Sequence, residues 1–434
     1  MQCDLRSVVA GRDVGGYQWR VVVVASIGDG EVWKFFLQGC LMVVLLSICY
    51  ILASPKTTSA AKFDVTSYGA KGDRKTDDTN AFLDAWADLC KSKSPKPTLI
   101  IPSKKTFLVG PVEFSGSCES STIHVKIMGN IVAPKTMKGW KNCVENRFWI
   151  VFTMVQGLTI DGPGQIDGQG SLWWGQTELS NMCERPTALH FHECNGLRLS
   201  GTTHLNSPFL HISIVNCQDV DIGNLQIIAP ENSPNTDGID ISASSYINIH
   251  DSHIGTGDDC VAINGGIYNI NVTRVFCGPG HGISIGSLGE NGGYDTVEKV
   301  RVENCNITRT KNGLRIKTVP GGTGYAKGIV YQDIHLVNVE NPIIIDQHYC
   351  SNYEDAFCPA PPHEPAVQVS DVSYTNIHGS SASQQAITFD CSGKFKCTGL
   401  STWNVGITGP AGDIAYCKNA QGKFVSTSPR VRCH

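Results

Sequence analysis

Three five-residue units decide the fold: Gly238-Ile-Asp-Ile-Ser242, Cys260-Val-Ala-Ile-Asn264 and Gly282-Ile-Ser-Ile-Gly286. Each unit carries apolar residues at its second and fourth positions, which is the period-two pattern of a β-strand with one buried face. The units align without gaps and begin 22 residues apart. The same kind of unit returns at Gly313–Lys317, Pro342–Asp346 and Ala386–Asp390. One short strand therefore recurs through the second half of the chain.

A second repeated element precedes these strands, and it has the form apolar-x-apolar with another apolar residue five positions on. The steps between its copies are 27, 23, 30 and 29 residues. Short strands at such periods predict a β-solenoid, whose coils stack into parallel sheets. We expect an all-β, single-domain right-handed parallel β-helix of about ten coils. A β-sandwich or several small β domains is the alternative, but neither requires units that align in this way. The copies are Val220/Ile222/Ile227, Ile247/Ile249/Ile254, Ile270/Val272/Cys277, Val300/Val302/Ile307 and Ile329/Tyr331/Leu336.

The start of this repetitive body has a different pattern. Residues 63–70 alternate like a strand, and Asp77 or Asp78 can cap the N-terminus of a helix. Because an exposed sheet edge invites further pairing, we expect this helix to cap the first coil of the solenoid. Its apolar face at helical spacing comprises Phe82, Ala85, Trp86 and Leu89.

Composition narrows the class of protein. The 434 residues are 41% apolar and only 17% charged, with 45 glycines, which excludes a disordered chain and a coiled coil. The 35 basic and 39 acidic residues are spread along the chain and give a net charge of -4. The sequence has no run of basic residues that could bind the phosphate backbone of a nucleic acid, so nucleic acid is excluded as a partner.

The N-terminal segment has the features of a targeting sequence. The apolar stretch over 35–53 follows Lys34 and predicts a signal peptide over 34–61, cleaved between Ala53 and Ala61. An uncleaved signal anchor is the competing interpretation. The preceding residues 1–33 form an extension of unclear role, and residues 62–434 form the predicted β-helix domain.

Cysteine usage and sequons also suit a secretory protein. Of the 18 cysteines, three (Cys3, Cys40 and Cys49) lie in the targeting segment, which leaves 15 in the body. These lack a paired C-x-x-C zinc pattern and predict disulfides, with at least one cysteine unpaired. The sequons at Asn271 and Asn306 are candidates for N-glycosylation.

Titratable residues stand directly before the aligned strands. Asp237, Asp259 and His281 occupy equivalent positions in successive units, and Asp258 stands one position earlier. If coils stack at about 4.8 Å, the three equivalent residues form one column. Each alone is more simply a turn residue, and the two adjacent carboxylates could instead hold calcium. Their alignment at one lateral position favours a shared site.

Two cations join this group from the next coil. Alternate positions of each strand face solvent, and in that coil they are Arg315 and Lys317. Either can be an ordinary surface charge, but together they can hold the carboxylates of an anionic sugar polymer. Grouped carboxylates repel and raise one pKa, so that an acid and a base coexist, as glycoside hydrolysis requires. We expect no metal in this site.

The motifs Asn235-Thr-Asp237, Gly257-Asp-Asp259, Gly280-His-Gly282 and Arg315-Ile-Lys317 resemble the four signature motifs of the polygalacturonases, glycoside hydrolase family 28. The resemblance extends from about Phe63 to Cys433 and is closest to the plant enzymes. It implies a right-handed parallel β-helix and hydrolysis of α-1,4-galacturonosyl bonds in pectic homogalacturonan, with inversion and without a cofactor. The departures are the N-terminal extension and Arg74, where related plant sequences tend to have Gly.

The resemblance also implies roles for individual residues. Asp258 matches the general acid, and Asp237 and Asp259 match the pair that orients and deprotonates the attacking water. His281 matches the residue that keeps the acid protonated. The matches to substrate-binding residues are Asn235, Arg315, Lys317 and Tyr349.

Cys260–Cys277 resembles the family's disulfide beside the active site. Proximity in sequence predicts three more bridges, Cys350–Cys358, Cys391–Cys397 and Cys417–Cys433.

The sequence thus predicts a secreted hydrolase of the plant cell wall and apoplast, with homogalacturonan as its substrate. Endo action is favoured over exo action. We expect a monomer, and an inhibitor protein is open as a further partner. Two rival functions remain: a pectate-lyase-type enzyme, which would need Ca²⁺, and a non-catalytic pectin-binding protein.

Overall fold

The computed structural model describes residues 60–140, 147–175, 183–350, 366–410, 412 and 414–433. These residues belong to one compact unit, Ser59–His434. The predicted extension over 1–33 and nearly all of the predicted signal segment over 34–61 lie outside the described residues and stay predictions. Within the described ranges, no helix combines the length and apolar character needed to cross a membrane.

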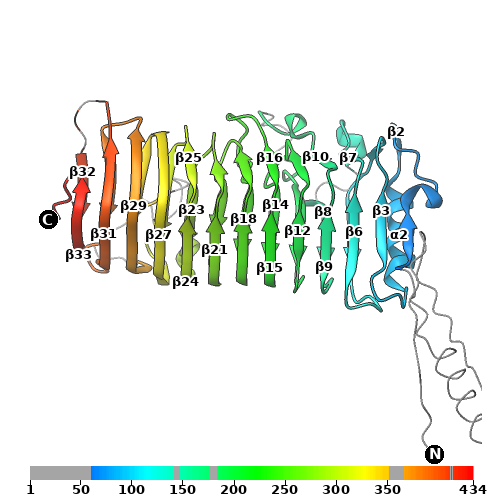
Figure 1. Ribbon diagram of the computed structural model, residues 1–434, viewed down its shortest axis with the longest axis horizontal. Coiled ribbons are helices and arrows are strands. Elements are labelled where there is room, and N and C mark those ends of the chain that lie inside the picture. Colours follow the sequence, from blue (N-terminus) through cyan, green and yellow to red (C-terminus); the bar gives the residue numbers. More distant parts are fainter. Residues whose placement is uncertain are drawn as a thin grey trace, which may run out of the picture. The chain divides into compact units, whose positions relative to one another are not determined.

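The strands form three parallel ladders that run from one end of this unit to the other (Figure 1). The first ladder comprises β1 (Lys62–Asp64), β3 (Thr98–Ile101), β6 (Ile123–Ile127), β9 (Leu158–Asp161), β12 (Arg198–Ser200), β15 (Gln218–Gly223), β18 (Ser245–His250), β21 (Ile267–Thr273), β24 (Tyr294–Glu303), β27 (Thr323–Val339), β29 (Gln368–Ser381), β31 (Cys397–Thr408) and β33 (Ala420–Ser428). The second comprises β2 (Asp73–Asp77), β4 (Thr106–Leu108), β7 (Asn130–Val132), β10 (Gln165–Asp167), β13 (Thr203–Leu205), β16 (Gln226–Ile228), β19 (His253–Gly255), β22 (Phe276–Cys277) and β25 (Asn306–Thr308). These two ladders join at β27, since both β24 and β25 pair with it.

The third ladder is a separate sheet of eleven strands, and it carries the repeated units. Its strands are β5 (Val112–Ser115), β8 (Phe148–Thr153), β11 (Thr187–His192), β14 (Ile212–Val215), β17 (Ile239–Ser242), β20 (Val261–Ile263), β23 (Ile283–Leu288), β26 (Asn312–Thr318), β28 (Asn341–Asp346), β30 (Gln385–Asp390) and β32 (Ile414–Lys418). The fold is a right-handed parallel β-helix, as the sequence predicts.

The register of the third ladder agrees with the alignment of the repeated units. Ile239 pairs with Val261, which pairs with Ile283, which pairs with Leu314. These side chains are at most 1% exposed, because every second residue of each strand points into the interior of the coil. The intervening residues therefore face outward and form two continuous columns along the sheet. The alternative of a β-sandwich is wrong.

The helix α2 (Thr79–Cys90) covers the first coil, as expected, and buries Phe82 and Trp86. Phe82 meets Phe107 edge to face with ring centroids 5.6 Å apart. Asp78 precedes the helix but its carboxylate binds the backbone of residues 71 and 72, whereas Asp77 accepts the N–H of Thr79 at 3.1 Å. The short 3-10 helices are η1 (Val65–Tyr68), η2 (Met137–Gly139), η3 (Gly170–Leu172) and η5 (Glu290–Gly292).

The expected strand over 63–70 is mostly wrong, since β1 ends at Asp64 and the chain continues as η1. The Asp64 carboxylate accepts the N–H of Thr66 at 2.8 Å, and Gly69 ends the turn with a φ of 97°. This capping replaces strand pairing. Nearby, Arg74 has a φ of 65°, a left-handed conformation that glycine adopts more easily.

The disulfides tie neighbouring coils together. The structure contains Cys260–Cys277, Cys391–Cys397 and Cys417–Cys433, together with Cys90–Cys118, which the sequence analysis did not propose. Cys350 is also disulfide-bonded, but Cys358 lies outside the described residues, so that pairing stays a prediction. The free cysteines among the described residues are all buried: Cys194, Cys217 and Cys305.

Both glycosylation candidates lie on strands. Asn271 belongs to β21 and Asn306 to β25, and each side chain is partly exposed. Their modification stays a prediction.

Candidate active site

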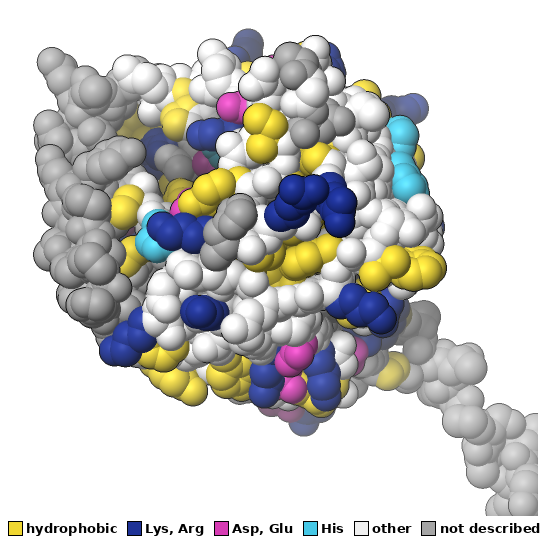
Figure 2. Space-filling model, turned by 90° about the vertical axis from the view of Figure 1, so that its left-hand side faces the viewer, with side chains coloured by type: hydrophobic (Ala, Val, Ile, Leu, Met, Phe, Trp, Pro, Cys, Tyr) yellow, Lys and Arg dark blue, Asp and Glu magenta, His cyan; other side chains and the backbone are white. Residues whose placement is uncertain are grey.

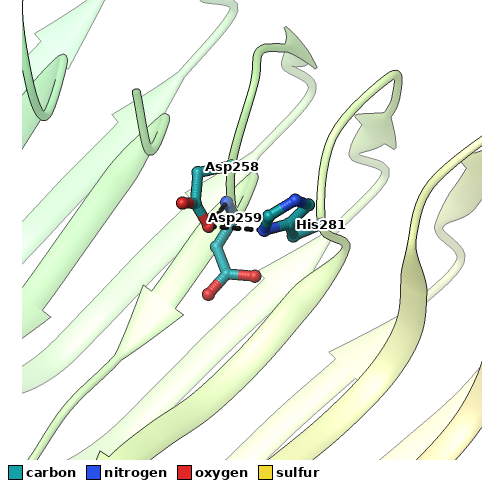
Figure 3. Close-up of side chains that lie close together, drawn as sticks. All are labelled: Asp258, Asp259 and His281. Carbon is teal, nitrogen blue, oxygen red and sulfur yellow. Dashed lines mark hydrogen bonds and ion pairs between the residues drawn. The ribbon is translucent and has the colours of Figure 1, made fainter. Parts of the chain in front are cut away.

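The candidate site forms where turns lead into strands of the third ladder. Asp258 and Asp259 precede β20, and His281 precedes β23 in the next coil (Figure 3). The Nδ1 atom of His281 lies 2.8 Å from Oδ1 of Asp258, and its backbone N–H donates to the Asp258 carbonyl at 2.7 Å. The expected column paired His281 with Asp259, but the imidazole bonds to Asp258 instead. The turn between coils shifts the side-chain contact by one residue.

Two glycines permit this close approach. A Cβ atom at Gly257 would lie 1.9 Å from the carbonyl oxygen of Ser233. One at Gly280, whose φ is 151°, would lie 2.6 Å from the carbonyl oxygen of Asp258. The disulfide Cys260–Cys277 links the coil that bears Asp258 to the coil that bears His281. Glycine and the covalent link thus hold adjacent turns at a fixed separation.

Asp259 is the anchor of a buried ionic network. Its side chain is 1% exposed, and its Oδ1 accepts from Arg315 Nη2 at 2.7 Å and from Ser284 Oγ at 2.7 Å. Lys317 Nζ lies 3.3 Å from Oδ2. Ser284 also accepts from Arg315 Nε at 2.9 Å. The network joins three coils through hydrogen bonds to one carboxylate.

This network corrects the expectation that Arg315 and Lys317 face solvent. Both point away from the interior of the coil, yet their side chains are only 8% and 11% exposed. They lie back along the sheet toward Asp259 because its charge compensates theirs in a buried setting. Lys317 Nζ also lies 5.2 Å from the centre of the Tyr349 ring.

The carboxylates have opposite pKa shifts. Burial, followed by the charges of Asp258 and Asp259, raises the pKa of Asp237 well above its ordinary value. Burial pushes the pKa of Asp258 upward too, but the hydrogen bond and charge of His281 outweigh it and lower that pKa. The resemblance implies that Asp258 is the general acid, which must carry a proton. In the free site Asp237 has the raised pKa.

Asn235 and Arg185 form the edge of the site next to Asp258. Asn235 Nδ2 donates to Oδ2 of Asp258 at 3.4 Å, and Arg185 Nη2 donates to Oδ1 of Asn235 at 2.6 Å. Arg185 also donates to the carbonyl of Pro234. Sequence reasoning missed Arg185, because it lies 50 residues before Asn235 and belongs to no repeated unit.

Ser284 and Asp240 were also missed, although a signal for both was present. They occupy outward positions of the aligned units, in the same column as Arg315. Burial raises the pKa of Asp240 to about 6, against a hydrogen bond from Asn264 at 2.9 Å. Because both residues share an outward column with Arg315, the repeat pattern itself indicates them as site residues.

The cluster does not suit a metal ion. Asp258, Asp259 and His281 place potential ligand atoms within 4.8 Å of one another. However, both oxygens of Asp259 already accept from cationic groups. A divalent cation would meet the positive charges of Arg315 and Lys317 at close range, which costs free energy in a buried site.

Comparison with known proteins assigns the sequence to one family. The model of the glycosyl hydrolases family 28 matches residues 90–428, a range that includes every site residue described above. The chain belongs to glycosyl hydrolase family 28.

Relatives of this hydrolase resemble it over most of its length. It is 47% identical to a probable polygalacturonase of Arabidopsis thaliana over 382 residues, which cover 87% of this chain and 81% of the relative. It is 44% identical to a polygalacturonase of Persea americana, covering 83% and 77% of the two chains.

Solved structures share the fold of this hydrolase. An endo-xylogalacturonan hydrolase of Aspergillus tubingensis superposes with a TM-score of 0.72 at 23% identity, covering 87% of this chain and 99% of the other. An exopolygalacturonase of Thermotoga maritima superposes with a TM-score of 0.67 at 22% identity, covering 86% and 93%.

The shifted carboxyl of Asp240 makes the stability of the hydrolase depend on pH. With a pKa of about 6 in the folded protein against 3.8 ordinarily, Asp240 stabilises the fold below about pH 4. This stabilisation is lost as the pH rises through 6, by at most about 3 kcal/mol. We expect Asp240→Asn to show a smaller decrease in the free energy of unfolding between pH 4 and pH 7 than the parent, because an amide does not titrate. Urea unfolding at pH 4 and pH 7 measures it, and an unchanged difference between the two pH values would contradict the assignment.

Proposed function

We propose that this hydrolase is a secreted polygalacturonase that cleaves α-1,4-galacturonosyl bonds of homogalacturonan with inversion. The observation that carries the proposal is the pairing of Asp258 with His281 beside the Asp259–Arg315–Lys317 network. It places a proton-transfer group next to two cations. The relatives from Arabidopsis thaliana and Persea americana are named as polygalacturonases, which supports the same substrate class.

In this proposal Asp258 is the general acid. Its side chain is 17% exposed, so it can reach a bound glycosidic oxygen, and its hydrogen bond with His281 holds the proton close to that oxygen. Because the pKa of Asp258 is lowered in the free site, this role requires that bound polymer shields the carboxyl from water and so raises its pKa. Asp258 passes the proton to the leaving oxygen as the glycosidic bond breaks.

Asp237 and Asp259 orient and deprotonate the attacking water. The raised pKa of Asp237 makes it, once it is ionised, a stronger base than an ordinary carboxylate. Asp259, held by Arg315 and Lys317, positions the water and offsets part of the charge of the two cations. Arg315, Lys317, Asn235 and Tyr349 contact the galacturonate unit next to the scissile bond.

Two observations support endo action and secretion. A hollow of about 590 Å³ lies over β5, β8 and β11, on the same sheet as the site and toward its N-terminal end. It is lined by Arg147, Phe148, His190 and His192 among others. Such room beside the site suits a polymer that continues past the cleaved bond. The disulfides suit an oxidising compartment such as the apoplast.

The first experiment is an assay on polygalacturonic acid near pH 5 with excess chelator. We expect release of reducing ends without ultraviolet absorbance, because hydrolysis adds water and forms no double bond. A ladder of oligomers establishes endo action, and monomer alone would contradict it. Unsaturated products that disappear with chelator would show a lyase. Folded protein that binds the polymer without cleaving it would show a binding protein.

A further inference from the structure

The C-terminal end of the β-helix is strongly basic. From residue 391 onward the sequence contains six basic residues and one acidic residue, Asp413, although the whole chain has a net charge of -4. Figure 2 views the molecule from this end and shows Lys and Arg side chains spread over it, with few acidic ones. The basic residues are Lys394, Lys396, Lys418, Lys423, Arg430 and Arg432.

Three of these cations surround a hollow, which we call the C-terminal hollow. It has a volume of about 660 Å³ and is lined by Tyr416, Lys418, Asn419, Arg430 and Arg432 among others. The three cationic side chains are exposed, and none of them forms an ion pair within the described part of the chain. Their charges are therefore available to a ligand.

The tail that contributes the arginines is held in place. The disulfide Cys417–Cys433 ties the tail to β32, the strand that bears Tyr416 and Lys418. Val431 is 8% exposed, so it anchors the tail between the two arginines. Arg430 and Arg432, on either side of Val431, are both exposed. The hollow is thus built by a covalent link and a buried side chain.

Acidic groups separate this hollow from the candidate active site. Along one outward column Lys317 is followed by Asp346, Asp390 and Lys418, and three strand spacings place the two lysines about 14 Å apart. His348 Nδ1 lies 3.1 Å from Asp390 Oδ2, and the backbone N–H of His348 donates to the carboxylate of Asp346. Both carboxylates are bonded to His348, so this stretch of the column offers a polyanion no cation without a partner among the described residues. A polyanion held at the hollow is therefore not guided continuously into the site.

We propose that the C-terminal hollow is an auxiliary site that binds unesterified galacturonan, apart from the segment being cleaved. Its ligand is a chain with a carboxylate on every sugar, which guanidinium and ammonium groups bind through charged hydrogen bonds. The ring of Tyr416, 40% exposed, offers an apolar face on which a sugar can lie. This inference rests on the proposed substrate of the enzyme. It would keep the hydrolase on the polymer between cleavage events.

The test is the triple variant Lys418→Gln, Arg430→Gln, Arg432→Gln in an Asp258→Asn background, so that the probe stays uncut. The probe is fluorescent polygalacturonate at low salt and pH 5. We expect at least a tenfold weaker Kd than for the Asp258→Asn parent, with less than a twofold change for a matched control, Lys62→Gln, Lys71→Gln, Lys75→Gln, at the opposite end. Parent-like binding by the triple variant would overturn the proposal. The proposal would also be overturned if the parent bound fully methyl-esterified pectin, or a sulfated polymer, at the hollow as tightly as it binds polygalacturonate.

Activity separates this inference from the proposed function. With Asp258 intact, kcat/KM is measured on polygalacturonate and on trigalacturonate. We expect the ratio of the first value to the second to be about tenfold lower in the triple variant than in the enzyme without the three substitutions. An equal loss on both substrates would show that the three residues act on the segment being cleaved, and it would overturn the proposal. If the enzyme with Asp258 intact cleaves neither substrate but the triple variant still loses binding, the proposed polygalacturonase function fails and the auxiliary site stands.

Discussion

Replacing the carboxyl group of Asp258 by an amide lowers kcat on polygalacturonate by about a thousandfold or more. An amide cannot donate a proton to the glycosidic oxygen, and general acid catalysis contributes roughly 10²- to 10⁴-fold to rate. The substitution Asp258→Asn keeps the size of the side chain and its hydrogen bond to the backbone N–H of Asp259. The measurement is the rate of reducing-end release at pH 5 with saturating polymer.

The matched control for this variant is Asp84→Asn, an exposed carboxylate on α2 at the far end of the β-helix. It should retain the rate of the parent within twofold. A purified and folded Asp258→Asn protein with parental turnover would show that another group supplies the proton. The raised pKa of Asp237 makes that residue the next candidate, and Asp237→Asn would then be the variant that loses activity.

Replacing Asp259 by alanine destabilises the protein by about 3–5 kcal/mol in addition to abolishing activity. The change leaves Arg315 and Lys317 buried without a counter-charge, and such unpaired ions account for losses of this size. Urea unfolding of Asp259→Ala and the parent at one pH gives the difference in the free energy of unfolding.

A surface ion pair provides the control. Arg198 and Asp219 lie 2.9 Å apart, but their side chains are 41% and 70% exposed, so Asp219→Ala should cost less than about 1 kcal/mol. If the two variants lose the same small amount, the buried network does not stabilise the fold. Restoring stability by combining Asp259→Ala with Arg315→Met and Lys317→Met would show that uncompensated charge is the cause.

The sequence by itself was sufficient to predict the coil register and most of the candidate site. Period-two alternation specifies which face of each strand is buried, and a slip of one residue would expose every inward side chain. Units that align without gaps therefore predict which residues stack, and Ile239, Val261 and Ile283 do stack. The expected strand over 63–70 failed because side-chain capping by Asp64 acts locally and leaves no periodic signal.

Only the tertiary structure decided which of the grouped charges pair with one another. His281 reaches Asp258 rather than Asp259, and both cations turn back to Asp259 and become buried. Arg185 and the C-terminal hollow come from chain segments outside the repeated units. Hydrogen bonding and burial depend on distances of a few tenths of an ångström between turns, and strand periodicity does not encode those distances. The sequence determined which residues share a face of the β-helix, and three-dimensional packing determined the partner and the pKa of each.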